Sequence, residues 1–269
     1  MHVLIAGGSG FIGQALCKEL QNNRIQTAIL TRNKNRAAGF FSSQDVSIYT
    51  YEDDIPPCEV VINLAGESIS ARLLSNRRRE EILRSRLNVI SHLKDKLAAS
   101  PPELFIQASA TGIYTKGQNC DECGALDNNL YSSICCSVEK SAGSAFSKTA
   151  IARIGVVLGQ GGGLYRITRR LPPFRIIGGN NHLPWISLED CARAFVFLTI
   201  HRLNGIFNFT SPNLLTCNQI LAKCPSLLKM PVIPIPKLAL TVDRRADLLL
   251  YDGIITPHNL QSSGFVFNS

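Results

Sequence analysis

Short runs of apolar, β-branched residues alternate along the chain with stretches of helical periodicity. The runs that we interpret as strands cover residues 2–6, 26–31, 46–50, 59–64, 104–108, 151–154 and 206–209. Helical patterns lie near residues 11–22, 78–99, 130–147 and 188–202. Strands that alternate with helices in this way form parallel sheets with crossover helices. The pattern predicts an α/β protein with a Rossmann-like, doubly wound parallel sheet.

Two segments interrupt the alternation. Residues 156–185 are rich in Gly, Pro and Arg, and from about residue 213 onward the chain combines helical stretches and prolines with no strong strand. We therefore expect a Rossmann domain over residues 1–155, to which residues 186–212 return. Residues 156–185 and 213–269 then form a small C-terminal substrate lobe. In open α/β sheets ligands bind at the carboxyl ends of the strands, where such a lobe would close over them.

The composition is typical of a folded globular protein, with 269 residues of which 45% are hydrophobic and 18% charged. No apolar run approaches the roughly 20 residues of a membrane helix, so we expect no membrane partner. The chain starts directly with the strand-like run His2–Ala6, which predicts no signal peptide. Of nine cysteines only Cys120 and Cys123 have CxxC spacing, with no second pair. This pattern favours reduced thiols, a cytoplasmic setting and no metal site.

Positive charge exceeds negative charge, with a formal net charge of +8. The basic residues gather in Arg77–Arg79 and in a second group of Arg166, Arg169, Arg170 and Arg175. Solvated helix faces explain such groups, and so does a positive potential for a phosphate-bearing cofactor or an anionic substrate. A nucleic-acid surface would rest on the charge alone, so we expect no nucleic-acid partner.

A glycine-rich turn, Gly7–Gly13, follows the first strand and opens the first helix. Its glycines have the spacing G-x-x-G-x-x-G. Glycine at the turn tolerates positive φ, the middle glycine lets a pyrophosphate approach the backbone, and the last lets helix and strand pack closely. The helix N-terminus adds free N–H groups and a positive dipole end. We therefore predict a dinucleotide site whose ligand contacts are Gly7, Ser9, Gly10, Phe11, Ile12 and Gly13.

The second strand ends in Thr31 and Arg32, where an acidic residue would bind the ribose 2′-hydroxyl of NAD. Arg32 has Lys34 and Arg36 close behind it. A cation at this point suits a 2′-phosphate, which predicts NADP as the cofactor.

Several motifs together resemble the extended short-chain dehydrogenase/reductase family, and more narrowly its "epimerase family", or sugar nucleotide epimerase-like, branch. They are Val61–Glu67, Ile82–Arg86, Ala108–Tyr114, Arg153–Gly159, Gly161–Leu164 and Pro184–Ile186 followed by Asp190. The stretch from about residue 218 resembles the branch's small terminal domain, although relatives usually continue for another helix after Phe267. The resemblance implies further cofactor contacts at Thr31, Arg32, Leu64, Ala65, Gly66, Glu81, Arg86 and Val157.

Reductases of this family use Ser, Tyr and Lys, with Tyr-x-x-x-Lys on one helical face. In register with the branch's Cys-x-x-Trp-Glu pattern, Ser109 takes the serine position, Cys135 the tyrosine position and Glu139 the lysine position. Registers that use Tyr131 or Tyr114 find no lysine four residues on. A glutamate beside a thiol raises the thiol's pKa, so the usual relay cannot form. Two alternatives stay open for Glu139: it acts as a base, or it pairs with a nearby Arg or Lys.

These observations favour an NADP-binding oxidoreductase or epimerase-like protein. We expect a small polar substrate, with a nucleotide-linked compound as one candidate, and leave the oligomeric state open. The alternative is a non-catalytic NADP-bound regulator or binding module, which the missing Tyr/Lys pair favours.

Overall fold

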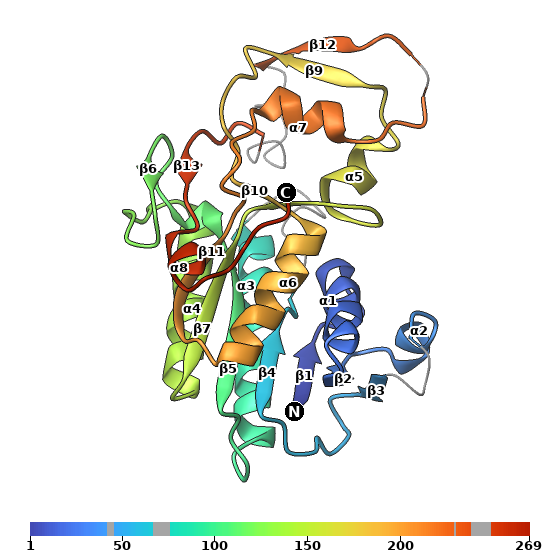
Figure 1. The fold of residues 1–269 in the computed structure, drawn as a ribbon, viewed down its shortest axis with the longest axis vertical. Helices are drawn as coiled ribbons and strands as arrows, with labels where there is room; N and C mark the ends of the chain where they lie inside the picture. Colours follow the sequence, from blue (N-terminus) through green and yellow to red (C-terminus); the bar gives the residue numbers. More distant parts are fainter. Residues whose placement is uncertain (42–45, 67–75, 229, 238–248) are drawn as a thin grey trace.

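A seven-stranded parallel sheet forms the centre of the molecule (Figure 1). The computed structural model describes residues 1–41, 46–66, 76–228, 230–237 and 249–269. In spatial order the strands are β11 (Gly205–Phe209), β7 (Thr149–Ile154), β5 (Leu104–Ala110), β4 (Val60–Asn63), β1 (His2–Ala6), β2 (Gln26–Leu30) and β3 (Val46–Tyr49). All neighbours are parallel, and the order reverses between β1 and β4. This confirms the predicted Rossmann-like fold.

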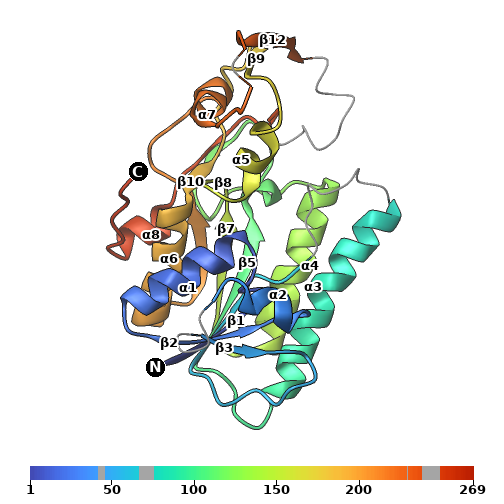
Figure 2. The same ribbon diagram turned by 90° about the vertical axis from the view of Figure 1, so that its right-hand side faces the viewer.

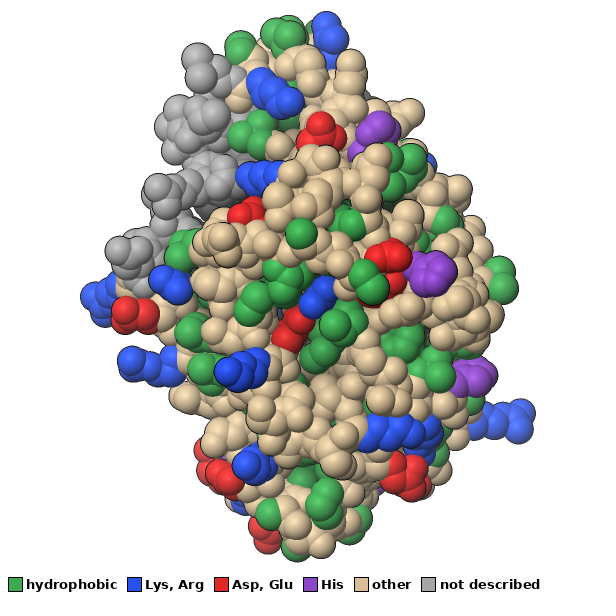
Figure 3. Space-filling view, turned by 90° about the vertical axis from the view of Figure 1, so that its left-hand side faces the viewer, with side chains coloured by type: hydrophobic (Ala, Val, Ile, Leu, Met, Phe, Trp, Pro, Cys, Tyr) green, Lys and Arg blue, Asp and Glu red, His purple; other side chains and the backbone are tan. Residues whose placement is uncertain are grey.

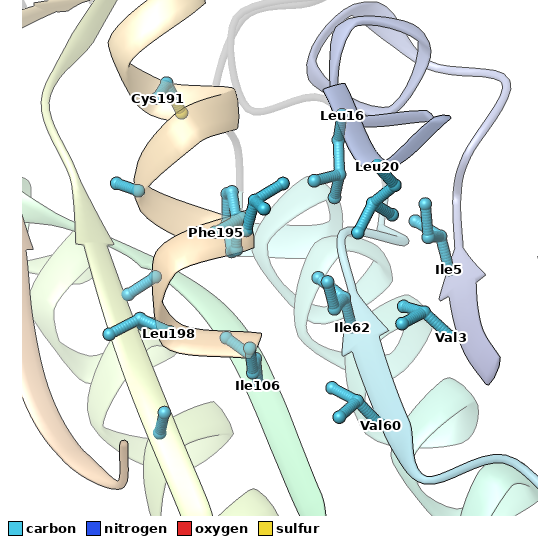
Figure 4. Packing of buried hydrophobic residues seen from close by; sticks show 14 of the residues in the cluster. Val3, Ile5, Leu16, Leu20, Val60, Ile62, Ile106, Cys191, Phe195 and Leu198 are labelled. Atoms are coloured by element: carbon cyan, nitrogen blue, oxygen red, sulfur yellow. The ribbon is translucent and has the colours of Figure 1, made fainter. Parts of the chain in front are cut away.

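Helices cover both faces of this sheet (Figure 2). On one face, α1 (Phe11–Asn22) and α6 (Leu188–His201) pack on the side chains of Val3 and Ile5 (Figure 4). On the other, α3 (Asn76–Lys96) and α4 (Leu130–Ala145) pack on those of Leu4 and Ala6. Successive strand residues point to opposite faces, so β1 is buried from Val3 to Ala6, and these four residues form a continuous apolar run. The two layers hold the carboxyl ends of the strands in fixed positions.

Beyond those carboxyl ends lies a smaller layer with its own apolar cluster (Figure 1). Its elements are α5 (Gly163–Thr168), β9 (Phe174–Ile177), α7 (Cys217–Lys223) and β12 (Ile233–Pro236). The ribbon of β8 (Val156–Leu158) and β10 (Trp185–Ser187) connects it to the main sheet. Val156, Leu158 and Trp185 belong to the cluster of this layer, whereas Ile186 belongs to the main core.

The expectation of no strong strand beyond residue 213 is wrong. β12 pairs with β9, and β13 (Ile254–Ile255) pairs with β6 (Asn119–Cys120). Neither strand has a recognisable alternation, because β12 reads Ile-Pro-Ile-Pro and β13 has two residues. Each forms because a distant segment offers it a backbone partner, which local sequence does not reveal.

The last segment returns to the main domain. After α8 (His258–Ser262), Phe265 packs into the core beside α6. The fully buried Asp190 carboxylate accepts hydrogen bonds from the backbone of Asn268 and Ser269 and from the Ser269 hydroxyl. Within the described residues, the remaining elements are the short helix α2 (Lys34–Ala38) and the 3-10 turn η2 (Thr111–Ile113).

Two further features bear on possible partners. No helix within the described residues is long and apolar enough to cross a membrane. Acidic and basic side chains are interspersed on the face in Figure 3, so the described part of this face has no continuous basic stripe.

Candidate functional site

The glycine turn after β1 has the backbone geometry that its sequence predicts. Gly7 has φ +81° and donates its N–H to the Leu30 carbonyl at 3.0 Å. A Cβ on Gly7 would lie 2.9 Å from the backbone nitrogen of Ala65. The conformation and the close approach both require glycine. The turn therefore lies directly against the segment that follows β4.

The other glycines of the turn differ in how much space surrounds them. A Cβ on Gly13 would lie 2.5 Å from the Gly8 carbonyl oxygen, and one on Gly8 would lie 2.3 Å from Cγ2 of Ile29. These two positions serve close packing. A Cβ on Gly10 would meet only the Gly7 carbonyl oxygen, at 3.2 Å. Space over Gly10 is thus open at the start of α1, where free N–H groups bind anions.

A groove of about 510 Å³ opens over this turn. Its lining includes eight of the fourteen predicted cofactor residues, namely Gly7, Ser9, Gly10, Thr31, Arg32, Leu64, Ala65 and Gly66. They come from the ends of β1, β2 and β4, so the fold gathers residues from three segments at the carboxyl edge of the sheet. This is the place where open α/β sheets bind dinucleotides.

Three of the other predicted cofactor residues do not line the groove but pack close to it. Arg86 lies against Gly66, since a Cβ there would be 2.9 Å from Cγ of Arg86. Phe11 packs against Gly162, where a Cβ would be 2.2 Å from Cγ of Phe11. Gly13 supports the turn from behind, as described above.

The remaining three lie apart from the groove lining. Ile12 and Val157 pack against the main core cluster. Glu81 on α3 pairs with Arg77 and Arg78, each at 3.2 Å. Its carboxylate therefore interacts with its own helix. Glu67, the last residue of the motif after β4, lies outside the described residues.

Sequence reasoning missed one wall of the groove. Ser85, Asn88, Val89 and His92 of α3 line it, together with Tyr51. The first four recur at helical spacing and form one face of α3, which is the signal that could have identified them. The ring of His92 meets that of Tyr51 edge-on, with centroids 4.9 Å apart. Burial, and next the charge of Lys96, lower the pKa of His92, which favours the neutral imidazole at pH 7.

A second group of polar side chains lies across three strands near the same edge. Ser109 on β5 is the register partner of Arg153 on β7, and Arg153 is the register partner of Asn208 on β11. Parallel pairing places these side chains in a row. α4 lies over the row and contributes Cys135 and Glu139. The structure thus brings all three predicted catalytic residues together.

Glu139 makes an ion pair with Arg153, which the sequence reasoning did not assign a role. The Nε of Arg153 donates to Oε1 of Glu139 at 3.1 Å, and its Nη2 donates to Oε2 at 2.8 Å. The hydroxyl of Ser109 also donates to Oε1, at 2.5 Å. The side chain of Arg153 is 4% exposed and that of Glu139 is 12% exposed, so the pair is shielded from water. A charged residue inside an otherwise apolar strand run was the available signal.

Arg153 also positions the polar groups behind it. Its Nη1 donates to the hydroxyl of Tyr114 at 2.9 Å, and that hydroxyl donates to Oδ1 of Asn208 at 2.7 Å. Burial would lower the pKa of the guanidinium, but hydrogen bonds and the charge of Glu139 outweigh it and raise that pKa. Burial raises the pKa of Tyr114 to about 12, so this fully buried phenol stays protonated at pH 7.

Cys135 is a buried thiol. Burial is the main cause that raises its pKa, and the charge of Glu139 raises it further, against a hydrogen bond with Ser109 that lowers it. The expected effect of the glutamate on the thiol is confirmed in direction. Cys135 is therefore a neutral thiol at physiological pH, and it cannot replace the acid–base tyrosine by ionising there.

The geometry agrees with comparisons to known proteins. A family model described as "NAD dependent epimerase/dehydratase family" matches residues 3–209. The chain belongs to this family. The epimerase family protein SDR39U1 of Mus musculus is 30% identical over 290 residues, covering 100% of this chain and 96% of the relative. A chloroplastic homologue from Arabidopsis thaliana is 29% identical over 295 residues, covering 99% and 83%.

Solved structures of the NAD dependent epimerase/dehydratase type share the fold. The human epimerase family protein SDR39U1 (isoform 2), crystallised with NADPH, has a TM-score of 0.80 at 23% identity, covering 100% of this chain and 95% of that one. The Thermotoga maritima UDP-glucose 4-epimerase with UDP-glucose has a TM-score of 0.77 at 19% identity, covering 97% and 92%. The family model and the mouse relative confirm the family resemblance stated from the sequence.

Proposed function

We propose that this member of the NAD dependent epimerase/dehydratase family binds NADP(H) in the groove over the glycine turn. The observation that carries the proposal is the open space over Gly10, at the start of α1 and between Thr31 and Ala65. A pyrophosphate would fill it and accept hydrogen bonds from the first N–H groups of the helix. The adenosine end would extend toward Tyr51 and His92, which line the groove.

The preference for NADP over NAD rests on Arg32. It lines the groove just after β2, and the exposed Lys34 and Arg36 follow on the short helix α2. A guanidinium binds a phosphate with two parallel hydrogen bonds, which a ribose hydroxyl cannot match. The solved relative with NADPH supports this assignment.

The proposed reaction is an oxidoreduction or epimerisation on a small polar substrate. When bound, the cofactor supplies or accepts a hydride. Ser109 would take a proton from a substrate hydroxyl while its own proton moves to Oε1 of Glu139, which it already contacts at 2.5 Å. Arg153 holds Glu139 in place from the other side. Cys135 closes this site with an apolar, neutral side chain.

The layer beyond the sheet would select the substrate. We assign residues 156–185 and the described part of residues 213–251 to this substrate lobe, because their apolar cluster lies over the carboxyl ends of the strands. The expected bounds of the lobe, 156–185 and 213–269, are thereby shortened, since Leu260 and Phe265 pack into the main core. The UDP-glucose of the Thermotoga relative favours a nucleotide-linked substrate. All nine cysteines are free, which supports a reducing setting such as the cytoplasm.

One observation favours the second candidate, an NADP-bound regulator without turnover. Both oxygens of Glu139 are engaged by Arg153, so the carboxylate is stabilised in its charged form by a buried cation. Such a group is a weak base. In this case the Ser109 row would serve packing, and the protein would change its partners or stability with the redox state of the cofactor.

A substrate panel followed by NADPH absorbance separates the two candidates. For an enzyme, Ser109→Ala lowers turnover by about 10²–10⁴-fold while NADPH affinity stays unchanged, because the proton path is lost. Thr149→Ala on β7, at the opposite end of that strand from Arg153, is the matched control and keeps full turnover. Turnover that survives Ser109→Ala would refute the proposed chemistry. Absence of turnover on the whole panel, with NADPH bound, supports the regulator.

A further inference from the structure

A second cavity, of about 440 Å³, lies beside α5 and outside the dinucleotide groove. Three arginines line it: Arg166 in the last turn of α5, and Arg169 and Arg170 just after it. Tyr165 and Leu227 also line it and add apolar surface. The cavity therefore combines several positive charges with an apolar wall.

No acidic side chain compensates these charges within the described residues. None of the three arginine side chains makes an ion pair or a side-chain hydrogen bond in the part of the chain that the structure describes. The sequence has no Asp or Glu between residues 140 and 188 or between 191 and 242. All three arginines are exposed, and like charges within one helical turn repel each other, so a bound anion would stabilise this end of α5.

The walls of the cavity are held together by backbone and side-chain hydrogen bonds. Leu227 donates its N–H to the carbonyl of Arg169 at 3.1 Å. The hydroxyl of Ser226 donates to the carbonyl of Leu171 at 2.7 Å. These bonds fix the segment that bears the apolar wall against the segment that bears the arginines. The charges and the apolar surface thus face one cavity.

The cavity is a neighbour of the dinucleotide groove and shares no lining residue with it. Gly161 lines the cavity, and the next residue, Gly162, packs against Phe11 at the start of α1. Gly161 and Gly162, just before α5, therefore lie between the arginine cavity and the dinucleotide groove. A ligand of the arginine cavity can bind while the dinucleotide groove is full.

We propose that this cavity binds a second, phosphorylated small molecule through Arg166, Arg169 and Arg170. Arginine forks bind phosphate oxygens in pairs, and three of them suit a ligand with two or more phosphate groups. Tyr165 and Leu227 would contact the rest of the ligand. The inference goes beyond the proposed function, since it requires neither the dinucleotide nor turnover.

Calorimetric titration of inorganic pyrophosphate into NADPH-saturated protein tests the proposal. We expect one site, with Kd raised about tenfold in Arg169→Ala, which is the usual loss when one charge-assisted hydrogen bond is removed. Arg175→Ala is the matched control: Arg175 is exposed on β9 and does not line the cavity. Its Kd should stay within about twofold, because a distant surface charge is screened by salt.

A second arm separates this site from the glycine turn. In Gly10→Val, which blocks the dinucleotide groove, pyrophosphate binding should persist with unchanged affinity. This arm also tests the cavity if NADPH itself fails to bind, so the two proposals fail separately. The inference is overturned by absence of pyrophosphate binding in both arms, by equal losses in Arg169→Ala and Arg175→Ala, or by binding that Gly10→Val removes. Binding to phosphatidylserine vesicles without pyrophosphate binding would also contradict it.

Discussion

Arg153 holds the carboxylate of Glu139 with two hydrogen bonds, of 3.1 and 2.8 Å. The family resemblance assigns Glu139 to the position of the reductases' lysine. Glu139 on α4 thus has a negative charge where that lysine would have a positive one. The positive charge comes instead from Arg153 on β7. Removing one member of a buried ion pair leaves an unpaired charge in a medium of low polarity. Replacing either residue of this pair therefore tests how much the pair stabilises the fold.

The first prediction concerns the stability of this pair. Glu139→Gln and Arg153→Met should each lower the free energy of unfolding by about 3–5 kcal/mol, and the double variant by less than the sum. Chemical denaturation measures all three. Glu103→Gln is the control, because it removes an ion pair between Arg202 and a glutamate side chain that is 63% exposed. This variant should lose less than about 1 kcal/mol of stability. Additive losses would show that Glu139 and Arg153 do not interact.

The second prediction concerns the choice of cofactor. Arg32→Ala should weaken NADPH binding by about 10–150-fold, which corresponds to about 1.5–3 kcal/mol for a hydrogen bond to a charged group. NADH affinity should hardly change, since NADH has no 2′-phosphate. Lys18→Ala, an exposed cation on α1, is the matched control. Equal NADPH and NADH affinities in the unmodified protein would contradict the assignment of Arg32.

The third prediction concerns the reactivity of Cys135. Its thiol is 7% exposed, and burial raises its pKa, so little of it is thiolate at pH 7.5. Iodoacetamide should modify the exposed Cys123 quickly and leave Cys135 unmodified in the folded protein. Peptide mass spectrometry reads both sites, and unfolded protein serves as the control. Alkylation of Cys135 at the rate of Cys123 would mean that the thiol is accessible and ionised.

The fourth prediction concerns Asp190 and the last residues of the chain. Burial would raise the pKa of Asp190, but hydrogen bonds from Ser269 and Asn268 and the contact with Arg193 outweigh it and lower that pKa. Because the folded pKa lies below the unfolded one, this stabilisation is present above the unfolded pKa of 3.8 and is lost as the pH falls through the folded pKa.

Asp190→Asn tests this account. The variant should lose about 3 kcal/mol of stability at pH 7, as expected for a buried hydrogen-bonded charge, and the loss should shrink below pH 3.8. Denaturation across a pH series measures it, with Asp95→Asn at an exposed position of α3 as the control. A loss that is the same at all pH values would exclude a role for the ionised carboxylate.

The sequence was sufficient for the parts of the site that lie on one short segment. The turn from Gly7 to Gly13 and the cation at Arg32 depend on local backbone and on their place after a strand, and both are recognisable from spacing. The partner of Glu139 was not, because Ser109 and Arg153 become neighbours only through the pairing of β5 with β7. Strand order is a property of the whole fold. For the same reason β12 was missed, since its partner β9 is remote in sequence.

Calorimetric titration of NADPH into the protein and into Gly10→Val tests the central claim most directly. Gly143→Val is the matched control, because this exposed helix glycine also has open space around it and lies far from the groove. We expect tight NADPH binding in the unmodified protein and in Gly143→Val. We expect none in Gly10→Val, whose far-UV circular dichroism should remain that of the folded protein. Unchanged NADPH binding by folded Gly10→Val would show that the dinucleotide does not bind over this turn.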